Sequence, residues 1–190
     1  MRSASAGADQ VATAIARSYS RSIVAETDLL TAFPRTLRAS TARPRVLYRR
    51  LPELIALHDR IEPPPGWEVV LTLEDPPILV CRCGTGALPR GIEDATLTPV
   101  YALTRRGALA IPSGLVLVRF REGIAPASCG DLLAREGFAI HLVLPYAPGA
   151  AWVKAVTGGI PASLRGIPAL ESLPDVVDVE PQMLKRSARR

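Results

Sequence analysis

The order of the apolar runs between residues 114 and 181 constrains the fold of this chain more than any other feature. A strand-like run is followed by an amphipathic stretch of helical length, two further strand-like runs, a segment marked by Pro and Gly, and a last strand-like run. This is the order of a split βαβ unit with a ferredoxin-like fold. We therefore predict an α+β fold in which a four-stranded antiparallel sheet carries two helices. The five runs lie at residues 115–120, 125–136, 139–144, 151–156 and 176–179.

The two helices of this unit differ in their sequence signals. The first has Pro126 in its opening turn, where the missing N–H costs no hydrogen bond, and Gly137 suits the left-handed position that ends a helix. The second is interrupted, because the tetrapeptide Gly-Ile-Pro-Ala occurs twice, seven residues apart. Proline inside a helix costs about 3 kcal/mol or more. We expect either two short helices, each started by its proline, or one helix from Pro168 to Leu173.

The chain before this unit divides into two parts. Residues 1–50 combine nine arginines with scattered Ser, Thr and Pro, which predicts a low-order basic arm with possible short helices. Residues 51–113 predict a small β-rich lead-in. Its expected elements are a short apolar helix at 51–58, strands at 67–73 and 78–83, and a hairpin that joins 99–103 to 108–111. The predicted division is thus an arm at 1–50, a lead-in at 51–113, the ferredoxin-like domain at 114–184 and a basic tail at 185–190.

The positive charge is concentrated at the two ends of the chain. The formal net charge is +5, yet residues 51–180 carry more acidic than basic side chains. Basic ends are more often solvated tails than binding surfaces. A ferredoxin-like RNA-binding domain needs stacking aromatic residues on its central strands, and the run from Leu115 to Arg121 offers only Phe120. We therefore expect no nucleic-acid partner, and an RNA-binding domain is the least favoured interpretation.

The residues that could carry metal or catalytic chemistry are few and scattered. Three cysteines form no disulfide framework, and Cys81 and Cys83 lack the further ligands that a metal site needs. The two histidines, His58 and His141, have no partners at the spacing of a Ser-His-Asp triad. We therefore expect no catalytic residues, no enzyme activity, no cofactor or metal, and no small-molecule ligand.

The sequence also lacks signals for membranes and export. It has no run of about 18 apolar residues, which a membrane-spanning helix would need. The first residues hold no continuous apolar core of a signal peptide. These observations predict a cytoplasmic protein without a membrane partner.

Two phrases bound the unit that begins near residue 114. The first is Val-Leu-Val-Arg-Phe-Arg-Glu-Gly-Ile at 116–124, and the second is Leu-Pro-Asp-Val-Val-Asp-Val-Glu-Pro-Gln at 173–182. They resemble the opening strand and the closing phrase of the propeptides of subtilisin-type serine proteases. Residues 99–114 are also similar to the segment that precedes the opening strand in bacterial subtilases with longer propeptides. The resemblance covers about residues 99–186, with a fainter echo back to Leu51.

This resemblance implies a non-catalytic inhibitor, folding chaperone, or both, for a subtilisin-like serine protease, acting in trans or as the partner of a split gene. In that family the sheet lies on two surface helices of the protease, and the C-terminal tail runs through the substrate cleft as an extended strand. The alternative is a regulatory or scaffold interaction module that keeps the fold without inhibiting a protease. On this mapping the protease-binding tail consists of Glu180, Pro181, Gln182, Met183 and Leu184.

Overall fold

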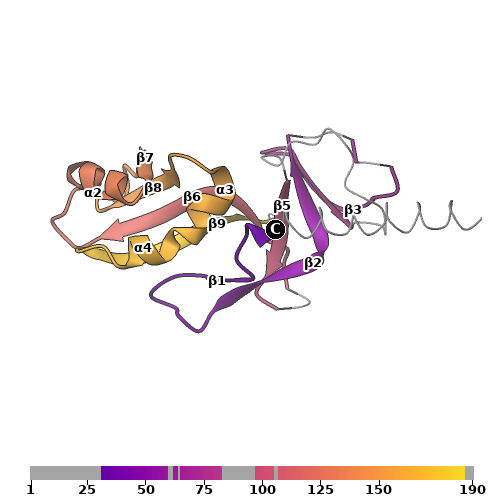
Figure 1. The fold of residues 1–190 in the computed structure, drawn as a ribbon, viewed down its shortest axis with the longest axis horizontal. Helices are drawn as coiled ribbons and strands as arrows, with labels where there is room; N and C mark the ends of the chain where they lie inside the picture. Colours follow the sequence, from indigo (N-terminus) through magenta and orange to yellow (C-terminus); the bar gives the residue numbers. More distant parts are fainter. Residues whose placement is uncertain (1–30, 60–61, 64, 83–96, 105–106, 187–190) are drawn as a thin grey trace, which may run out of the picture.

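Two antiparallel β-sheets make up most of the described part of the chain. The computed structural model describes residues 31–59, 62–63, 65–82, 97–104 and 107–186 (Figure 1). The first sheet contains β1 (Thr36–Arg38), β2 (Leu47–His58), β3 (Glu68–Leu73), β4 (Ile78–Arg82) and β5 (Leu97–Ala102). The second contains β6 (Ile111–Phe120), β7 (Phe138–Val143), β8 (Ala150–Ala155) and β9 (Val176–Leu184). The helices are the 3₁₀ turn η2 (Pro126–Cys129) and the α-helices α2 (Gly130–Arg135), α3 (Gly159–Arg165) and α4 (Ile167–Glu171).

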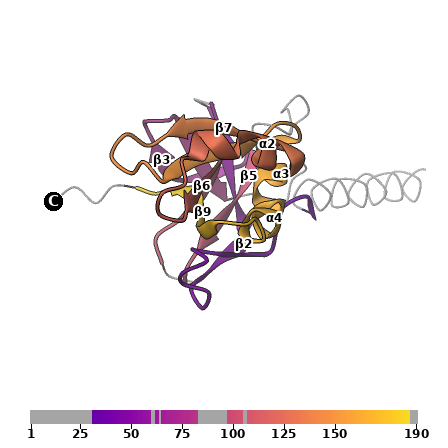
Figure 2. The same cartoon turned by 90° about the vertical axis from the view of Figure 1, so that its left-hand side faces the viewer.

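The long strand β2 organises the first sheet. One of its edges pairs with β5, while the other edge pairs with β1 near its start and with β4 near its end. β3 pairs with the far side of β4, and every pair is antiparallel. Figure 2 views the molecule with the second sheet in front of the first.

The prediction of a helix over residues 51–58 is wrong, because these residues belong to β2. Leu54 and Ala56 pack in one apolar cluster, and Ile55 and Leu57 pack in a second. Since successive side chains of a strand point to opposite faces, both faces of β2 are buried here. A strand buried on both faces is continuously apolar, and its periodicity cannot be told from that of a short buried helix.

The prediction of a low-order arm is wrong for residues 31–50, which form β1 and the start of β2. Phe33, Leu37 and Tyr48 are 6%, 6% and 7% exposed and belong to the main core. The strand pattern of residues 31–50 was hard to recognise in the sequence. Its few buried residues lie among exposed arginines and turn residues in the hairpin of β1 and β2. Residues 1–30, including the short helices expected there, lie outside the described residues.

The remaining predictions for the lead-in agree with the strands observed. Strands expected at 67–73 and 78–83 correspond to β3 and β4, which differ from them by one residue each. The expected hairpin is confirmed by Tyr101 and Ala110, whose backbones exchange hydrogen bonds of 2.9 and 2.8 Å. It leads directly into β6, so the two sheets are consecutive along the chain.

The second sheet has the strand order β7-β8-β6-β9, with antiparallel pairs throughout. η2 and α2 connect β6 to β7, and α3 and α4 connect β8 to β9, so the predicted sequence of elements is confirmed. The interrupted second helix is two short helices, with Pro168 in the first turn of α4. Gly137, with φ 78°, takes the left-handed conformation after α2. The chain thus has an α+β fold with two antiparallel sheets.

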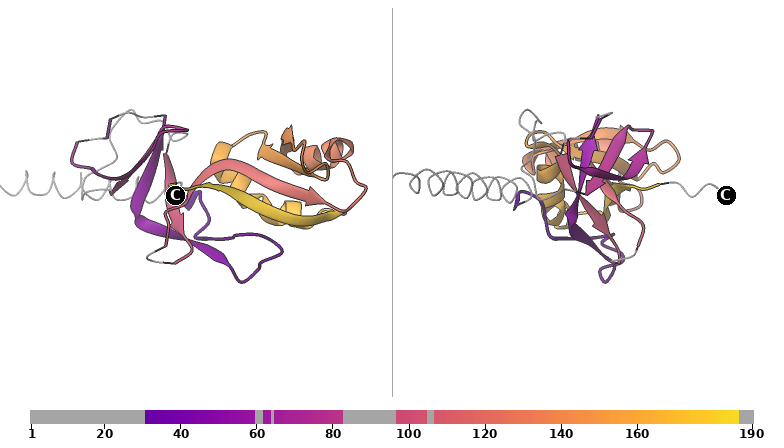
Figure 3. Two further views of the ribbon diagram at one scale, coloured as in Figure 1. Left: turned by 180° about the vertical axis from the view of Figure 1, so that it is seen from behind. Right: turned by 90° about the vertical axis from the view of Figure 1, so that its right-hand side faces the viewer.

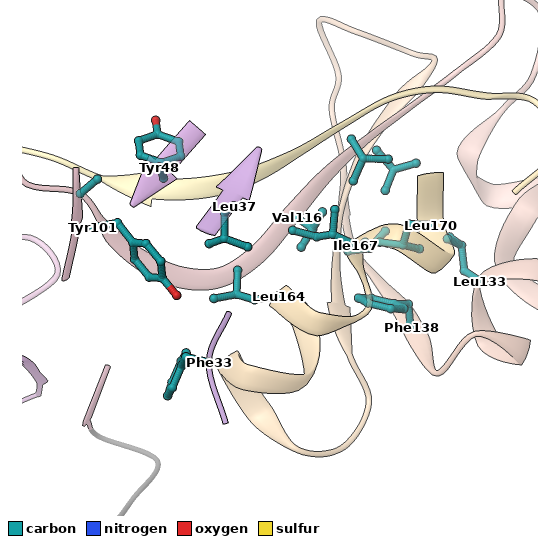
Figure 4. Packing of buried hydrophobic residues seen from close by; sticks show 14 of the residues in the cluster. Phe33, Leu37, Tyr48, Tyr101, Val116, Leu133, Phe138, Leu164, Ile167 and Leu170 are labelled. Atoms are coloured by element: carbon teal, nitrogen blue, oxygen red, sulfur yellow. The ribbon is translucent and has the colours of Figure 1, made fainter. Parts of the chain in front are cut away.

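The main core lies between the second sheet and its helices and continues to β1. Figure 4 shows Phe33 and Leu37 beside Leu164 of α3, at one end of a row of side chains that reaches Phe138 and Leu133. Residues from the predicted arm therefore complete the core of the predicted ferredoxin-like domain.

β6 and β9 also connect the two sheets. Ile111 pairs with Leu184 at the end of this ribbon, and both pack in a core cluster of the first sheet. The ribbon bends at Gly114, which has a φ of +88°, and a Cβ there would lie 3.0 Å from Cγ1 of Ile160. The left-handed conformation and the close approach of α3 both require glycine at this position.

Candidate functional site

Among the residues that the structure describes, no helix lies on one face of the second sheet. Seen from behind, β6 and β9 lie in front of α3 and α4 (Figure 3, left). Leu117 of β6 pairs with Trp152 of β8, which pairs with Leu142 of β7. Directly paired residues share a face, so these three side chains form a row across the sheet, which we call the apolar row. Leu117 is 7% exposed within a small cluster, whereas Leu142 is 51% exposed at the end of the row.

Charged and aromatic side chains border the apolar row. Arg119 of β6 and Lys154 of β8 lie on the same face, two positions from Leu117 and Trp152. Tyr146, in the connection between β7 and β8, is 82% exposed. Exposed apolar side chains with a polar border are typical of surfaces that bind other proteins.

The free edge of β9 is covered by residues 40–42, in the connection between β1 and β2. The Thr41 N–H donates to the Val179 carbonyl at 3.2 Å, and the Val179 N–H donates to Thr41 Oγ1 at 3.1 Å. Pro181 lies two positions after Val179 in the same strand, and it has no N–H that could bond to a strand added at this edge. An extended segment of a partner is therefore prevented from pairing with this edge.

Two carboxyl groups of β9, Asp178 and Glu180, lie next to each other at this connection. Burial alone would raise the pKa of Asp178, but hydrogen bonds from Ser40 Oγ at 2.8 Å and from the Ala42 N–H at 3.1 Å outweigh it, so the pKa is lowered. Burial and the neighbouring Asp178 raise the pKa of Glu180, against the attraction of Arg43 at 3.8 Å. As pH falls, Glu180 therefore takes up a proton before Asp178.

The five residues predicted to form a protease-binding tail lie within β9 and pair with β6. The pairs are Glu180 with Leu117, Pro181 with Val116, Met183 with Pro112 and Leu184 with Ile111, and Gln182 accepts a hydrogen bond from Ser113 Oγ. In this structure these residues therefore belong to a paired strand, and their binding to a protease stays a prediction. Proline has no N–H to donate to a neighbouring strand. The strand still continues through Pro181, because the backbone groups that face β6 belong to its neighbours Glu180 and Gln182.

The chain leaves the second sheet after Leu184. Nζ of Lys185 lies 5.3 Å from the ring centroid of Tyr48, at a distance suited to a cation–π contact. The described part of the predicted basic tail therefore begins beside the hairpin of β1 and β2.

The other residues singled out in the sequence are not brought together. Nε2 of His58 lies 2.9 Å from Thr98 Oγ1, and burial lowers the pKa of His58. His141 is exposed on β7 of the second sheet, whereas His58 lies in β2 of the first. Cys81 is buried in the first sheet, Cys129 is half-buried in η2, and Cys83 lies outside the described residues. No group of three or more His, Cys, Asp or Glu side chains in the described ranges is arranged to hold a metal.

The contacts between residues 40–42 and β9 could not be recognised in the sequence. Ser40 and Asp178 are 138 positions apart, so no local pattern relates them. The one available signal was the residue type, because Ser and Thr readily bond to backbone groups at the ends of strands and turns.

Comparison with known proteins gave no further assignment, since no family model, curated protein or solved structure matched the chain significantly. In the part of the chain that the structure describes, none of the helices has the length and apolar character needed to cross a membrane.

Proposed function

We propose that the second sheet and its helices form a ferredoxin-like domain similar to a subtilisin propeptide, and that the chain binds and inhibits a subtilisin-like serine protease or assists its folding. The strand order β7-β8-β6-β9, with a helical connection after β6 and after β8, supports this fold. The observation that carries the proposal is the helix-free face with the apolar row at its centre. The protein itself would bind without catalysing a reaction.

The proposed contact places the apolar row against surface helices of the protease. Burial of Leu142 and Trp152 would contribute about 25 cal/mol for each Å² of apolar surface removed from water. Arg119 and Lys154 would favour an acidic partner surface and would fix its orientation. Because the same contact would form with the folded protease and not with the unfolded one, it would also stabilise the folded protease.

Inhibition on this proposal rests on the sheet face and on residues that follow Leu184. Residues 180–184 could enter a substrate cleft only after leaving β6, with the loss of their paired backbone hydrogen bonds. Residues from Lys185 onward need no such rearrangement. The chain would thus use a docked face together with the basic segment that follows Leu184.

The proposal is tested by titrating the full chain into a subtilisin-like protease and following hydrolysis of a chromogenic peptide. We expect activity to fall with added chain, and Leu142→Glu to weaken the inhibition at least about tenfold, because a buried unpaired carboxylate costs more than 1.4 kcal/mol. Val70→Glu is the matched control, since Val70 is 40% exposed on the first sheet and should leave inhibition unchanged. Undiminished hydrolysis in the presence of excess native chain would contradict inhibition.

A regulatory or scaffold module is the second candidate, and the position of residues 180–184 favours it. These residues are held in β9, so a protease could be bound without its cleft being filled. Size-exclusion chromatography of the mixture separates the two candidates. A complex that retains full hydrolytic activity would support the scaffold module over the inhibitor.

A further inference from the structure

A groove separates β1 from helices α3 and α4. Its volume is about 470 Å³, which is within the range of about 300–1,000 Å³ found for ligand-binding pockets. Its floor is apolar and is formed by Phe33, Leu37, Leu164 and Ile167, which are 6%, 6%, 1% and 7% exposed. Figure 4 shows Leu164 between Leu37 and Phe33, with Ile167 further along the same row.

β1 presents backbone groups to this groove. The Arg50 N–H donates to the Arg35 carbonyl at 3.0 Å, and the Ala39 N–H donates to the Val46 carbonyl at 2.8 Å, so the odd-numbered residues of β1 bond to β2. The direction of the backbone groups alternates along a strand, so those of Thr36 and Arg38 point away from β2. Both residues line the groove. The groove thus has the free edge of a strand along one side.

The rim of the groove is basic. Arg38 and Arg165 line it, and the Arg38 side chain is 46% exposed. Glu171 is the one acidic residue among the described lining residues, and its carboxylate accepts a hydrogen bond from Thr41 Oγ1 at 3.0 Å and pairs with Arg38 at 3.4 Å. Arg165 therefore carries the excess positive charge of this lining. An occupant with negative charge would therefore be favoured over a neutral or positive one.

We propose that this groove binds an extended segment of a partner protein in which acidic and apolar side chains alternate. The segment would add a strand to β1 through the backbone groups of Thr36 and Arg38. Because side chains alternate in direction along a strand, the apolar ones would enter the floor beside Ile167 while the acidic ones would meet Arg38 and Arg165 at the rim. The proposal is independent of the protease-binding face, which lies on the opposite side of the second sheet from α3 and α4.

The probe is a fluorescein-labelled heptapeptide that alternates Glu and Val, and its binding to the full-length chain is followed by fluorescence anisotropy. We expect saturable binding that weakens about tenfold in Arg165→Glu, because the substitution reverses the charge of the rim. Arg135→Glu is the matched control, since Arg135 is also an exposed arginine in the last turn of a helix, and it should change the affinity less than about twofold. A peptide that alternates Lys and Val should not bind.

A second pair of variants tests strand addition separately from charge. Thr36→Pro removes an N–H that points into the groove and is not used by β2, so it should abolish binding, while Thr36→Ala keeps the N–H and should retain it. Thermal unfolding of both variants confirms that they are folded before the comparison is made. Three results would each overturn the proposal. The first is equal binding of the peptide by these two variants, the second is equal weakening of binding by the two arginine variants, and the third is no anisotropy change with the native chain. Dissociation of a dimer of the free chain by the peptide would also overturn it, in favour of a second copy as the occupant.

Discussion

The two sheets of this molecule differ in how many of their faces are buried. In the first sheet, Leu54 and Leu57 point to opposite sides of β2, and each is buried in its own cluster. In the second sheet, helices cover one face, and the other face holds the apolar row with Leu142 51% exposed. This part of β2 leaves little surface for a partner, although β3 of the same sheet keeps Val69 42% exposed. The comparison supports the proposal that a protease binds the helix-free face, while the groove beside β1 would serve a different partner.

The sheets are nevertheless joined through a shared ribbon. β6 and β9 carry Val118 and Val179 in the main core and Ile111 and Leu184 in a core of the first sheet. The two units should consequently unfold together, although their clusters are distinct. The following predictions test the division of roles and the connection between the sheets, in order of decreasing effect.

Deletion of residues 180–190 should have the largest effect. It removes the C-terminal half of β9, which pairs with β6, takes Leu184 away from a core cluster of the first sheet, and removes Pro181 from a buried position. Since full burial of each large apolar side chain contributes about 1.5–3 kcal/mol, we expect loss of the cooperative unfolding transition by circular dichroism. Deletion of residues 185–190 alone is the control and should change the free energy of unfolding by less than about 1 kcal/mol. A cooperative transition after the longer deletion would show that the sheets do not depend on β9.

Truncation of leucine on the two sheets should distinguish their faces. Leu57 is 0% exposed, so Leu57→Ala creates a cavity in the core. We expect it to lower the free energy of unfolding, measured by urea denaturation, by about 2–5 kcal/mol. Leu117→Ala affects a small cluster that opens to solvent beside Trp152. It should therefore lower the free energy of unfolding by less than Leu57→Ala does. Equal losses would mean that the helix-free face is as well packed as the core and would weaken its assignment as a binding face.

Ser40→Ala should lower the free energy of unfolding by about 1–3 kcal/mol, because it removes a hydrogen bond from a buried carboxylate. Ser40 is 1% exposed and donates to Asp178 at 2.8 Å. Ser128→Ala is the matched control, since the exposed Ser128 donates to a carbonyl within its own turn. A loss for Ser40→Ala no larger than that for Ser128→Ala would contradict the role of residues 40–42 in holding β9.

The smallest effect is expected from the pH dependence of Asp178 and Glu180. The pKa of Glu180 is raised, so its contribution to stability is present at low pH and is lost as the pH rises through that pKa. The pKa of Asp178 is lowered, so its contribution is present at neutral pH and is lost as the pH falls through that pKa. Glu180→Gln should therefore be more stable than the native chain at pH 7, with the difference vanishing in acid. Urea denaturation between pH 3 and pH 7 checks this, and a difference that grows toward acid would contradict it.

The sequence was sufficient to predict the order of elements in the second sheet because its short apolar runs are separated by segments rich in Gly and Pro. Gly137 and the two Gly-Ile-Pro-Ala segments determined where its helices end, and the structure agrees with both. β2 was predicted incorrectly because burial on both faces removes alternation. β1 and the continuation of β9 past Pro181 were missed for another reason. β1 packs in a core with residues of α3 far along the chain, and β9 continues past Pro181 by pairing with the start of β6, where Ser113 and Gln182 are 69 positions apart. Neither contact leaves a local pattern.

The helix-free face itself could be expected once the order of elements was known, but its composition could not. Trp152 and Leu142 stood in predicted strands, yet the bulge in β7 beside His141 decides which of its residues pair with β8. The groove beside β1 was beyond prediction, because it depends on how the hairpin of β1 and β2 lies next to α3 and α4. Long-range packing, rather than local propensity, places both candidate surfaces.

The central claim is that a protease binds the helix-free face of the second sheet while the first sheet only supports it. The chain's two tryptophans report on these regions separately, since Trp152 lies in the apolar row and Trp67 packs against the first sheet. We would incorporate 5-fluorotryptophan and record ¹⁹F NMR spectra of the full chain with and without an inactivated subtilisin-like protease. The account predicts that the Trp152 resonance shifts on binding while the Trp67 resonance keeps its chemical shift. A shift of the Trp67 resonance alone, or no change in either, would contradict it.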